Sequence, residues 1–185
     1  KFVARGVHSL LYGDLLMTLY NQARAKELTP GSSKRKLDKW LRIIGLYFKS
    51  TAFLKFRHNC TKIVEDFATI PLCDEPRVKV GIVGEIYLKY SALGNNYLED
   101  FLISEKAEPV VSGVLDFILY ALSTNETNRS MYGIRKDNRS VTFSLKKVLI
   151  AKQNTMIKAI QDHSHFSPMD SFEELYTISD HIISK

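Results

Sequence analysis

Gly84 and Glu85 close an apolar, β-branched run, and they are well placed to form part of a ligand pocket. The run covers residues 78–83 and is typical of a buried strand in a parallel sheet. In open α/β sheets, ligands bind beyond the carboxyl ends of the strands. Gly84 would allow a close approach of backbone or ligand, and Glu85 would project into that crevice. Tyr87 follows as a third pocket candidate.

Asn95 and Asn96 are candidates for the same pocket, because they precede the next predicted helix. Unpaired N–H groups at a helix N-terminus favour an anion. Asn96 is also the predicted N-cap, with Glu99 three residues later as the reciprocal acid of a capping box. Two interpretations stay open, since Glu85 could merely cap a helix and the asparagines could merely start one. A bound dinucleotide is not expected, because the glycine spacing of a dinucleotide fingerprint is incomplete.

The positive charge of the chain is concentrated in its first half. The formal net charge is +6, and residues 1–75 contain 13 Lys and Arg against 7 Asp and Glu, whereas residues 76–185 contain 13 of each. The basic region, residues 34–62, also carries Trp40 and other aromatic residues. Stacking on nucleic acid is one interpretation. A solvated helix face over buried aromatics is the alternative that the helical spacing favours, so nucleic acid is not the expected partner.

Cys60 and Cys73 are the only cysteines, and they predict neither a metal site nor a disulfide framework. Twelve residues separate them, no Cys-x-x-Cys pair is present, and an iron–sulfur cluster normally needs three or four thiolates. We therefore expect no cofactor in this chain. Two free thiols suit a reducing cytoplasm, which is the predicted location.

The elements that would position these residues fall into two parts. Residues 1–75 predict a helical N-terminal subdomain, with helices over 7–25, from 33, and over 53–69, and with a break at residues 28–33. Residues 76–185 predict an α/β part with strands at 78–83 and 109–111 and an intervening helix from Asn96. Three helices should follow, over 113–123, 141–163 and 171–184, while residues 125–139 could be helix or ordered loop.

The fold class is therefore α/β, with a Rossmann-like β-α-β unit, a small and mainly parallel sheet and several flanking helices, preceded by the helical N-terminal part. Two strands are few for such a sheet, and the chain begins at Lys1, so we expect one compact unit cut from a longer protein. Residues 110–122 form the longest mostly apolar run, but they contain Asp116 and are too few to span a bilayer. A soluble protein without a membrane partner is expected.

Three segments resemble a known family. Residues 76–87 are PRVKVGIVGEIY, residues 95–102 are NNYLEDFL, and residues 106–111 are KAEPVV. Their order resembles the dehydratase-like region of the 2-hydroxyglutaryl-CoA dehydratase-like and CoA-substrate-specific enzyme activase family. In that region a strand ending in Val-Gly-Glu-Ile-Tyr leads to an Asn-initiated helix, and an acid precedes the next strand. Residues 76–122 carry nearly all of the resemblance, to which Gly13-Asp14 and Trp40 add a weaker match.

The resemblance implies a Rossmann-like fold and a role in radical acyl-CoA chemistry of the kind found in anaerobic metabolism. In the family, an ATP-hydrolysing activator passes an electron to an iron–sulfur partner that reduces a CoA thioester. The ATPase glycine signatures and the cluster cysteines have no match here. The chain is thus expected to be non-catalytic alone and to contribute a pocket or partner surface beside an iron–sulfur domain of the longer protein. An acyl-CoA or a dehydratase subunit would be its further partner.

In that setting Lys34, Arg35 and Lys36 could attract the phosphates of CoA. The alternative function is a non-enzymatic interaction domain that binds nucleic acid or an acidic partner through the basic region. Steep salt dependence of binding to duplex DNA would favour the interaction domain. Stabilisation by a CoA thioester would favour the dehydratase-type role.

Overall fold

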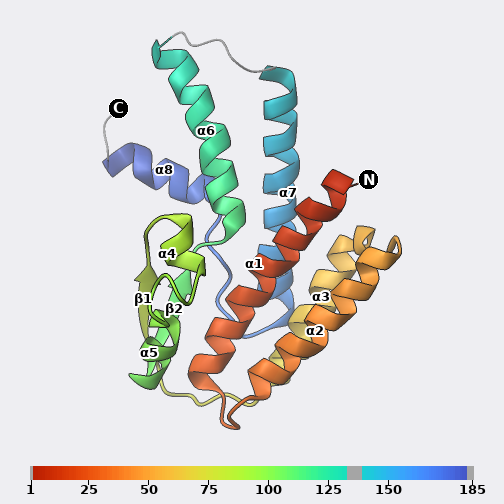
Figure 1. Cartoon of the computed structure of the whole chain (residues 1–185), viewed down its shortest axis with the longest axis vertical. Helices are drawn as coiled ribbons and strands as arrows, with labels where there is room; N and C mark the ends of the chain where they lie inside the picture. The colour runs from red at the N-terminus through yellow and green to blue at the C-terminus, as the bar shows by residue number, and fades with distance from the viewer. Residues whose placement is uncertain (1, 133–138, 183–185) are drawn as a thin grey trace.

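Figure 1 shows the computed structural model of the chain, which describes residues 2–132 and 139–182. Most of these residues are helical, and two short strands form a small parallel sheet. Along the chain the elements are α1 (Phe2–Lys26), α2 (Ser32–Lys49), the 3-10 turn η1 (Ala52–Leu54), α3 (Phe56–Ala68), β1 (Val78–Ile82), α4 (Ile86–Tyr90), α5 (Leu98–Ser104), β2 (Ala107–Val111), α6 (Val114–Tyr132), α7 (Arg139–His163) and α8 (Phe172–Ile182).

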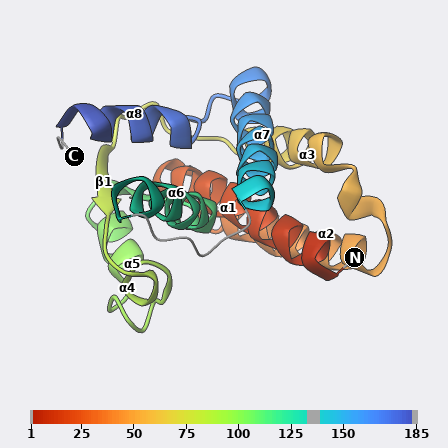
Figure 2. The same ribbon diagram turned by 90° about the horizontal axis from the view of Figure 1, so that it is seen from above.

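Helix α1 lies at the centre of the molecule. Leu11, Leu15 and Leu19 repeat every four residues along one face and are fully buried. The helix packs on α2 and α3, on β2, and on α6 and α7. Figures 1 and 2 show α2 and α3 on one side of α1 and the sheet with α8 on the other. One main core therefore includes residues from both sides of position 75.

The break predicted at residues 28–33 is a tight turn between α1 and α2. Gly31 takes a positive φ of 81°, a conformation that side chains rarely adopt. The carboxylate of Glu27 accepts hydrogen bonds from the backbone N–H of Gly31 and of Ser33, both at 2.7 Å. These bonds satisfy backbone donors at the start of α2, where the N-cap residue Gly31 has no side chain to accept them.

Strands β1 and β2 pair in parallel, with Val78 opposite Ala107 and Ile82 opposite Val111. Helices α4 and α5 form the connection between them, so the chain has the predicted α/β character. A second, smaller core joins the strands to α4 and α5. Its buried members are Ile82, Leu102, Ala107 and Val111, with Met17, Val80, Tyr90 and Leu98 packed against them.

Two details of this unit differ from the prediction. Strand β1 is largely exposed rather than buried, with Val78 at 74%, because the described elements bury its Ile82 end and leave most of the strand uncovered. Asn96 is not an N-cap, since α5 begins after Tyr97, and both Asn96 and Tyr97 take positive φ. That local geometry places Asn95 where its Oδ1 accepts the N–H of Leu98 at 3.3 Å.

The C-terminal helices complete the main core. Helix α6 begins at the predicted position and continues beyond residue 123, α7 packs along α3, and α8 follows a short segment at 164–171. Leu115 and Leu119 of α6 and Met156 and Ile160 of α7 are among the buried residues. Within the described residues, no helix combines the length and the apolar character needed to cross a bilayer.

Candidate functional site

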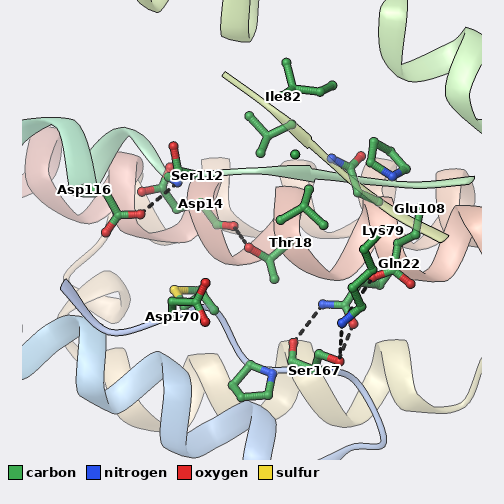
Figure 3. Close-up of a pocket in the computed structure, with 18 of the residues that line it drawn as sticks. Asp14, Thr18, Gln22, Lys79, Ile82, Glu108, Ser112, Asp116, Ser167 and Asp170 are labelled. Atoms are coloured by element: carbon green, nitrogen blue, oxygen red, sulfur yellow. Dashed lines mark hydrogen bonds and ion pairs between the residues drawn. The ribbon is translucent and has the colours of Figure 1, made fainter. Parts of the chain in front are cut away.

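A cavity of about 500 Å³ lies between α1, the two strands and the 164–171 segment (Figure 3). Helix α1 contributes Asp14, Thr18, Asn21 and Gln22 to its wall. Their spacing of four, three and one residues puts them on one face of the helix, which we call the α1 stripe. At 1.5 Å per residue, the stripe is about 12 Å long. The cavity is therefore elongated along α1, with a different set of polar groups at each end.

Asp14 dominates the acidic end. It is 4% exposed, and its two carboxylate oxygens accept the N–H groups of Val114 at 2.9 Å and of Leu115 at 2.8 Å. These are unpaired donors of the first turn of α6, so Asp14 acts as a cap supplied by another helix. Gly113 makes this approach possible. A Cβ at that position would lie 2.5 Å from Asp14 Oδ2.

Asp116 continues the same network. Its carboxylate accepts the N–H of Gly113 at 3.1 Å and the amide of Gln153 at 2.6 Å. Gln153 in turn accepts the N–H of Phe172 at 3.0 Å. Asp116 and Gln153 thus connect the starts of α6 and α8 to the middle of α7. The donors at the N-terminus of α6 already have protein carboxylates as partners.

Burial sets the electrostatics of this end. It raises the pKa of Asp14 to about 6, because the hydrogen bonds from Leu115 and Val114 only partly offset the loss of water, while the negative charge of Asp116 adds to the increase. Burial also raises the pKa of Asp116, although its hydrogen bonds and the charge of Lys89 oppose this shift. Asp170 faces the same end and is exposed.

Glu108 dominates the opposite end. It is 1% exposed, and it lies opposite Lys79 in the register of the two strands. Lys79 Nζ is 3.8 Å from Oε1, and Lys26 Nζ is 3.3 Å from Oε2. Buried Oε2 has no geometrically acceptable hydrogen bond among the described residues, so the contact with Lys26 is an ion pair only. Two cations therefore balance one buried carboxylate.

Ser167 closes this end of the cavity. Gln22 exchanges two hydrogen bonds of 2.8 Å with the backbone of Ser167, and Lys79 donates to its hydroxyl at 3.0 Å (Figure 3). These contacts hold the 164–171 segment against α1 and β1. Asn21, next to Gln22 on the stripe, is 4% exposed and lines the cavity. No hydrogen bond from its amide to another described residue is found.

The pocket residues predicted from the sequence lie in a surface segment, residues 84–97, and do not line this cavity. Glu85 caps α4, accepting the N–H of Leu88 at 3.2 Å. Gly84 takes a φ of 144°, and the ring of Tyr87 lies so close to Gly94 that a Cβ there would be 2.7 Å from it. Asn95 bonds within its own turn. The predicted pocket residues therefore lie together in one segment, but they form local turns and do not line the cavity.

The three basic candidates lie at the start of α2, away from the cavity. Lys34 pairs with Asp38 at 2.6 Å, and Arg35 donates to Ser32 at 2.9 Å. Lys36 pairs with Asp66 of α3 at 2.5 Å. Lys34 and Arg35 are exposed, so they remain accessible to an anion, whereas Lys36 has a structural contact.

The two cysteines do not fit an iron–sulfur cluster. Cys60 is fully buried, and burial raises the pKa of its thiol to about 12. Cys73 accepts a hydrogen bond from Arg77 at 3.5 Å. No group of three or more metal-ligating side chains occurs among the described residues.

The residues that form the cavity were missed as site candidates because sequence offers only weak signals for them. Asp14 interrupts an otherwise apolar helix face, and Glu108 precedes a proline inside a strand. Both belong to the segments that carry the family resemblance, yet nothing local shows that they share a cavity. Comparisons with family models, with curated proteins and with solved structures found no match.

Proposed function

We propose that this chain is the α/β segment of a protein of the 2-hydroxyglutaryl-CoA dehydratase-like and CoA-substrate-specific enzyme activase family. In this proposal it is a non-catalytic component of a 2-hydroxyacyl-CoA dehydratase system. It would contribute a pocket or partner surface beside an iron–sulfur domain that lies outside this chain. The location would be the cytoplasm.

The arrangement of the resembling segments supports the proposal. Residues 76–122 fold as one continuous unit that comprises β1, α4, α5, β2 and the start of α6. A parallel pair with a helical connection is compatible with a Rossmann-like unit.

The observation that carries the proposal is an uncovered apolar surface on the same unit. We call it the 83–101 surface, and its exposed large apolar residues are Val83, Ile86, Tyr87, Leu88, Leu93, Tyr97 and Phe101. Exposed apolar side chains that lie this close together in the sequence are expected where a protein contacts another protein surface. A segment that packs against a further domain is what the family resemblance implies.

The number of thiols in this chain indicates that an iron–sulfur cluster would lie elsewhere in the longer protein. A cluster needs more thiolates than the two cysteines provide, and Cys60 is buried in the main core. The cluster would therefore belong to another part of the longer protein, and this chain would contribute shape and surface.

The first experiment measures iron and acid-labile sulfide in the longer protein that carries this segment, purified without oxygen. The proposal expects both in stoichiometric amounts, and it expects the 185-residue chain alone to be colourless and iron-free. An iron-free longer protein that retains its fold would overturn the proposal.

A second experiment addresses the basic candidates. We expect CoA and acetyl-CoA to bind more weakly to Lys34→Gln/Arg35→Gln than to the unmodified chain, as measured by calorimetry. Lys36 is left intact because it contacts Asp66. Lys147→Gln/Lys158→Gln removes two exposed charges from α7 and is the matched control. Equal affinity in the two variants would remove Lys34 and Arg35 from the CoA site and leave the family proposal to the iron measurement.

A further inference from the structure

Asn21 is a buried polar group whose side chain has no hydrogen-bond partner among the described residues. It is 4% exposed and lines the cavity between Thr18 and Gln22. The amide atoms of Asn21 are reached from the cavity and are not engaged by the described residues, so they are open to a hydrogen bond with a molecule bound there.

The charges around the cavity restrict that ligand. Among the described residues that line it, four carry carboxyl groups, Asp14, Glu108, Asp116 and Asp170, against the single ammonium group of Lys79. Burial raises the pKa of Asp14 and of Asp116, and the negative charges of Asp116 and Asp170, respectively, add to these shifts, so a further negative charge nearby is disfavoured. The N-terminus of α6 attracts no anion here, since Asp14 and Asp116 already accept its N–H groups.

The two ends of the cavity differ in the charge of the ligand group that they would accept. At the Glu108 end, Lys26 and Lys79 already balance the carboxylate, so this end takes a neutral polar group near Asn21. At the Asp116 end, Asp170 adds a second, exposed carboxylate, and the negative charge of Asp170 acts on Asp116. The positive charge of Lys89 has the opposite effect on the pKa of Asp116. The ammonium group of Lys89, however, donates a hydrogen bond to the hydroxyl of Ser112. A cationic group would relieve the repulsion at this end.

We propose that the cavity binds a small organic cation, with a primary ammonium group between Asp116 and Asp170 and a neutral hydroxyl or amide group at Asn21. Val110, Val111, Met169 and Leu175 line the cavity as well and would contact the aliphatic middle of the ligand. Asp14 and Asn21 are seven residues apart on α1, so about 10 Å separates the two ends, and an aliphatic chain of about six carbons bridges them. This site is separate from any CoA site and goes beyond the proposed function.

The probes are 6-amino-1-hexanol, 6-hydroxyhexanoate and n-hexylamine, which have similar lengths and differ in one end group each. Calorimetry on the whole chain should show saturable binding of 6-amino-1-hexanol and none of 6-hydroxyhexanoate, because the carboxylate would meet Asp116 and Asp170. Hexylamine should bind about tenfold more weakly than aminohexanol, since it leaves Asn21 unpaired.

Two variants test the assigned contacts. Asn21→Leu removes the amide at nearly constant volume, and it should abolish the preference for aminohexanol over hexylamine. Asp170→Asn should weaken both amines about threefold to fivefold, as expected for a partly solvated ion pair. Asp162→Asn, on the exposed face of α7 outside the cavity, is the matched control and should change neither affinity.

The proposal is overturned if aminohexanol shows no saturable binding, if the carboxylate probe binds as tightly as the amine, or if Asp170→Asn and Asp162→Asn have the same affinity. Asp170 is exposed and has no hydrogen bond in the described structure, so its substitution leaves the fold intact. That variant keeps the test valid even if Asn21→Leu fails to fold.

Discussion

Asp14 is the residue on which the candidate site depends most. It is a charged residue on a central, apolar helix, and it meets the N-terminus of α6 a hundred residues later in the sequence. The cap replaces water at two backbone donors, but it buries a carboxyl group. Asp14 therefore caps the start of α6, and its burial there raises the pKa of its carboxyl group.

That balance predicts a dependence of stability on pH. The pKa of Asp14 is raised to about 6 from an unfolded value of 3.8, so the folded state binds the proton more tightly. The stabilisation from this proton is complete below the unfolded pKa and is lost as pH rises through 6. We expect the wild type to lose roughly 2–3 kcal/mol of unfolding free energy relative to Asp14→Asn when the pH rises from 4 to 7. Urea unfolding at several pH values measures it, and parallel profiles would contradict the prediction.

Gly113 permits the contact that Asp14 makes. An added methyl group would lie 2.5 Å from Asp14 Oδ2 and 2.8 Å from its Cγ, so the carboxylate must move away from α6. We expect Gly113→Ala to reduce the unfolding free energy by about 1–3 kcal/mol, and much less in an Asp14→Ala background. The double-mutant cycle is measured by chemical denaturation.

Gly45→Ala is the control for this series. Gly45 lies on α2 with open space where the methyl group of alanine would sit, so alanine should stabilise the chain by about 0.5–1 kcal/mol. If Gly113→Ala is as harmless as Gly45→Ala, the close approach of Asp14 is not needed for stability.

At the scale of elements, the basic residues of α2 attach that helix to α3. Asp66 of α3 accepts hydrogen bonds from Lys36, Lys39 and the indole of buried Trp40, at 2.5–2.9 Å. Burial raises the pKa of Asp66, but these three donors outweigh it and the net pKa is lowered. Part of the positive charge of the basic region is therefore structural, and Trp40 is not free to stack on nucleic acid.

Removing this acceptor should loosen the α2–α3 pair. Asp66→Ala leaves the Trp40 N–H without a partner, and we expect a loss of about 1–2 kcal/mol in unfolding free energy. Asp38→Ala removes the exposed partner of Lys34 on α2 and should cost less than about 0.5 kcal/mol. Thermal unfolding compares the two variants. Equal losses would mean that the Asp66 network adds nothing beyond an ordinary surface ion pair.

At the scale of the whole molecule, two cores of unequal size share α1. The main core contains the helices, whereas the small core joins the strands to α4 and α5. The small core leaves the 83–101 surface in contact with water, including Leu93 at 77% and Phe101 at 57% exposure. A molecule with this surface uncovered should associate with itself.

We expect Leu93→Lys/Phe101→Lys to reduce self-association, because two charges interrupt the 83–101 surface. The unfolding free energy should change by less than about 0.5 kcal/mol, since neither side chain is buried. Static light scattering against concentration and temperature measures association. Leu28→Lys, at an isolated exposed leucine, is the control and should have no effect. A large loss of stability in the double variant would show that these residues pack within the chain.

Helical periodicity and β-branched runs predicted most of the elements, but α4 was not predicted and α5 begins after Tyr97 rather than after Asn96. The leucines of α1, the apolar stripe of α2 and the strand at residues 78–83 are local patterns, and each corresponds to an observed helix or strand. The small parallel sheet was predicted as well. Local sequence also predicts the turn at residues 28–33, because its proline restricts φ and its glycine permits a positive φ.

The candidate site was not predictable in the same way. Asp14, Asn21, Glu108 and Asp116 come from three separate elements, and only their packing creates a shared cavity. Glu85 and Asn95 have the residue types of a pocket, yet their nearest partners are backbone N–H groups three residues away. Sequence determined where most of the helices and strands lie, because those preferences act between neighbours. Tertiary structure alone decided which polar groups lose water together, because burial depends on contacts between residues far apart in the chain.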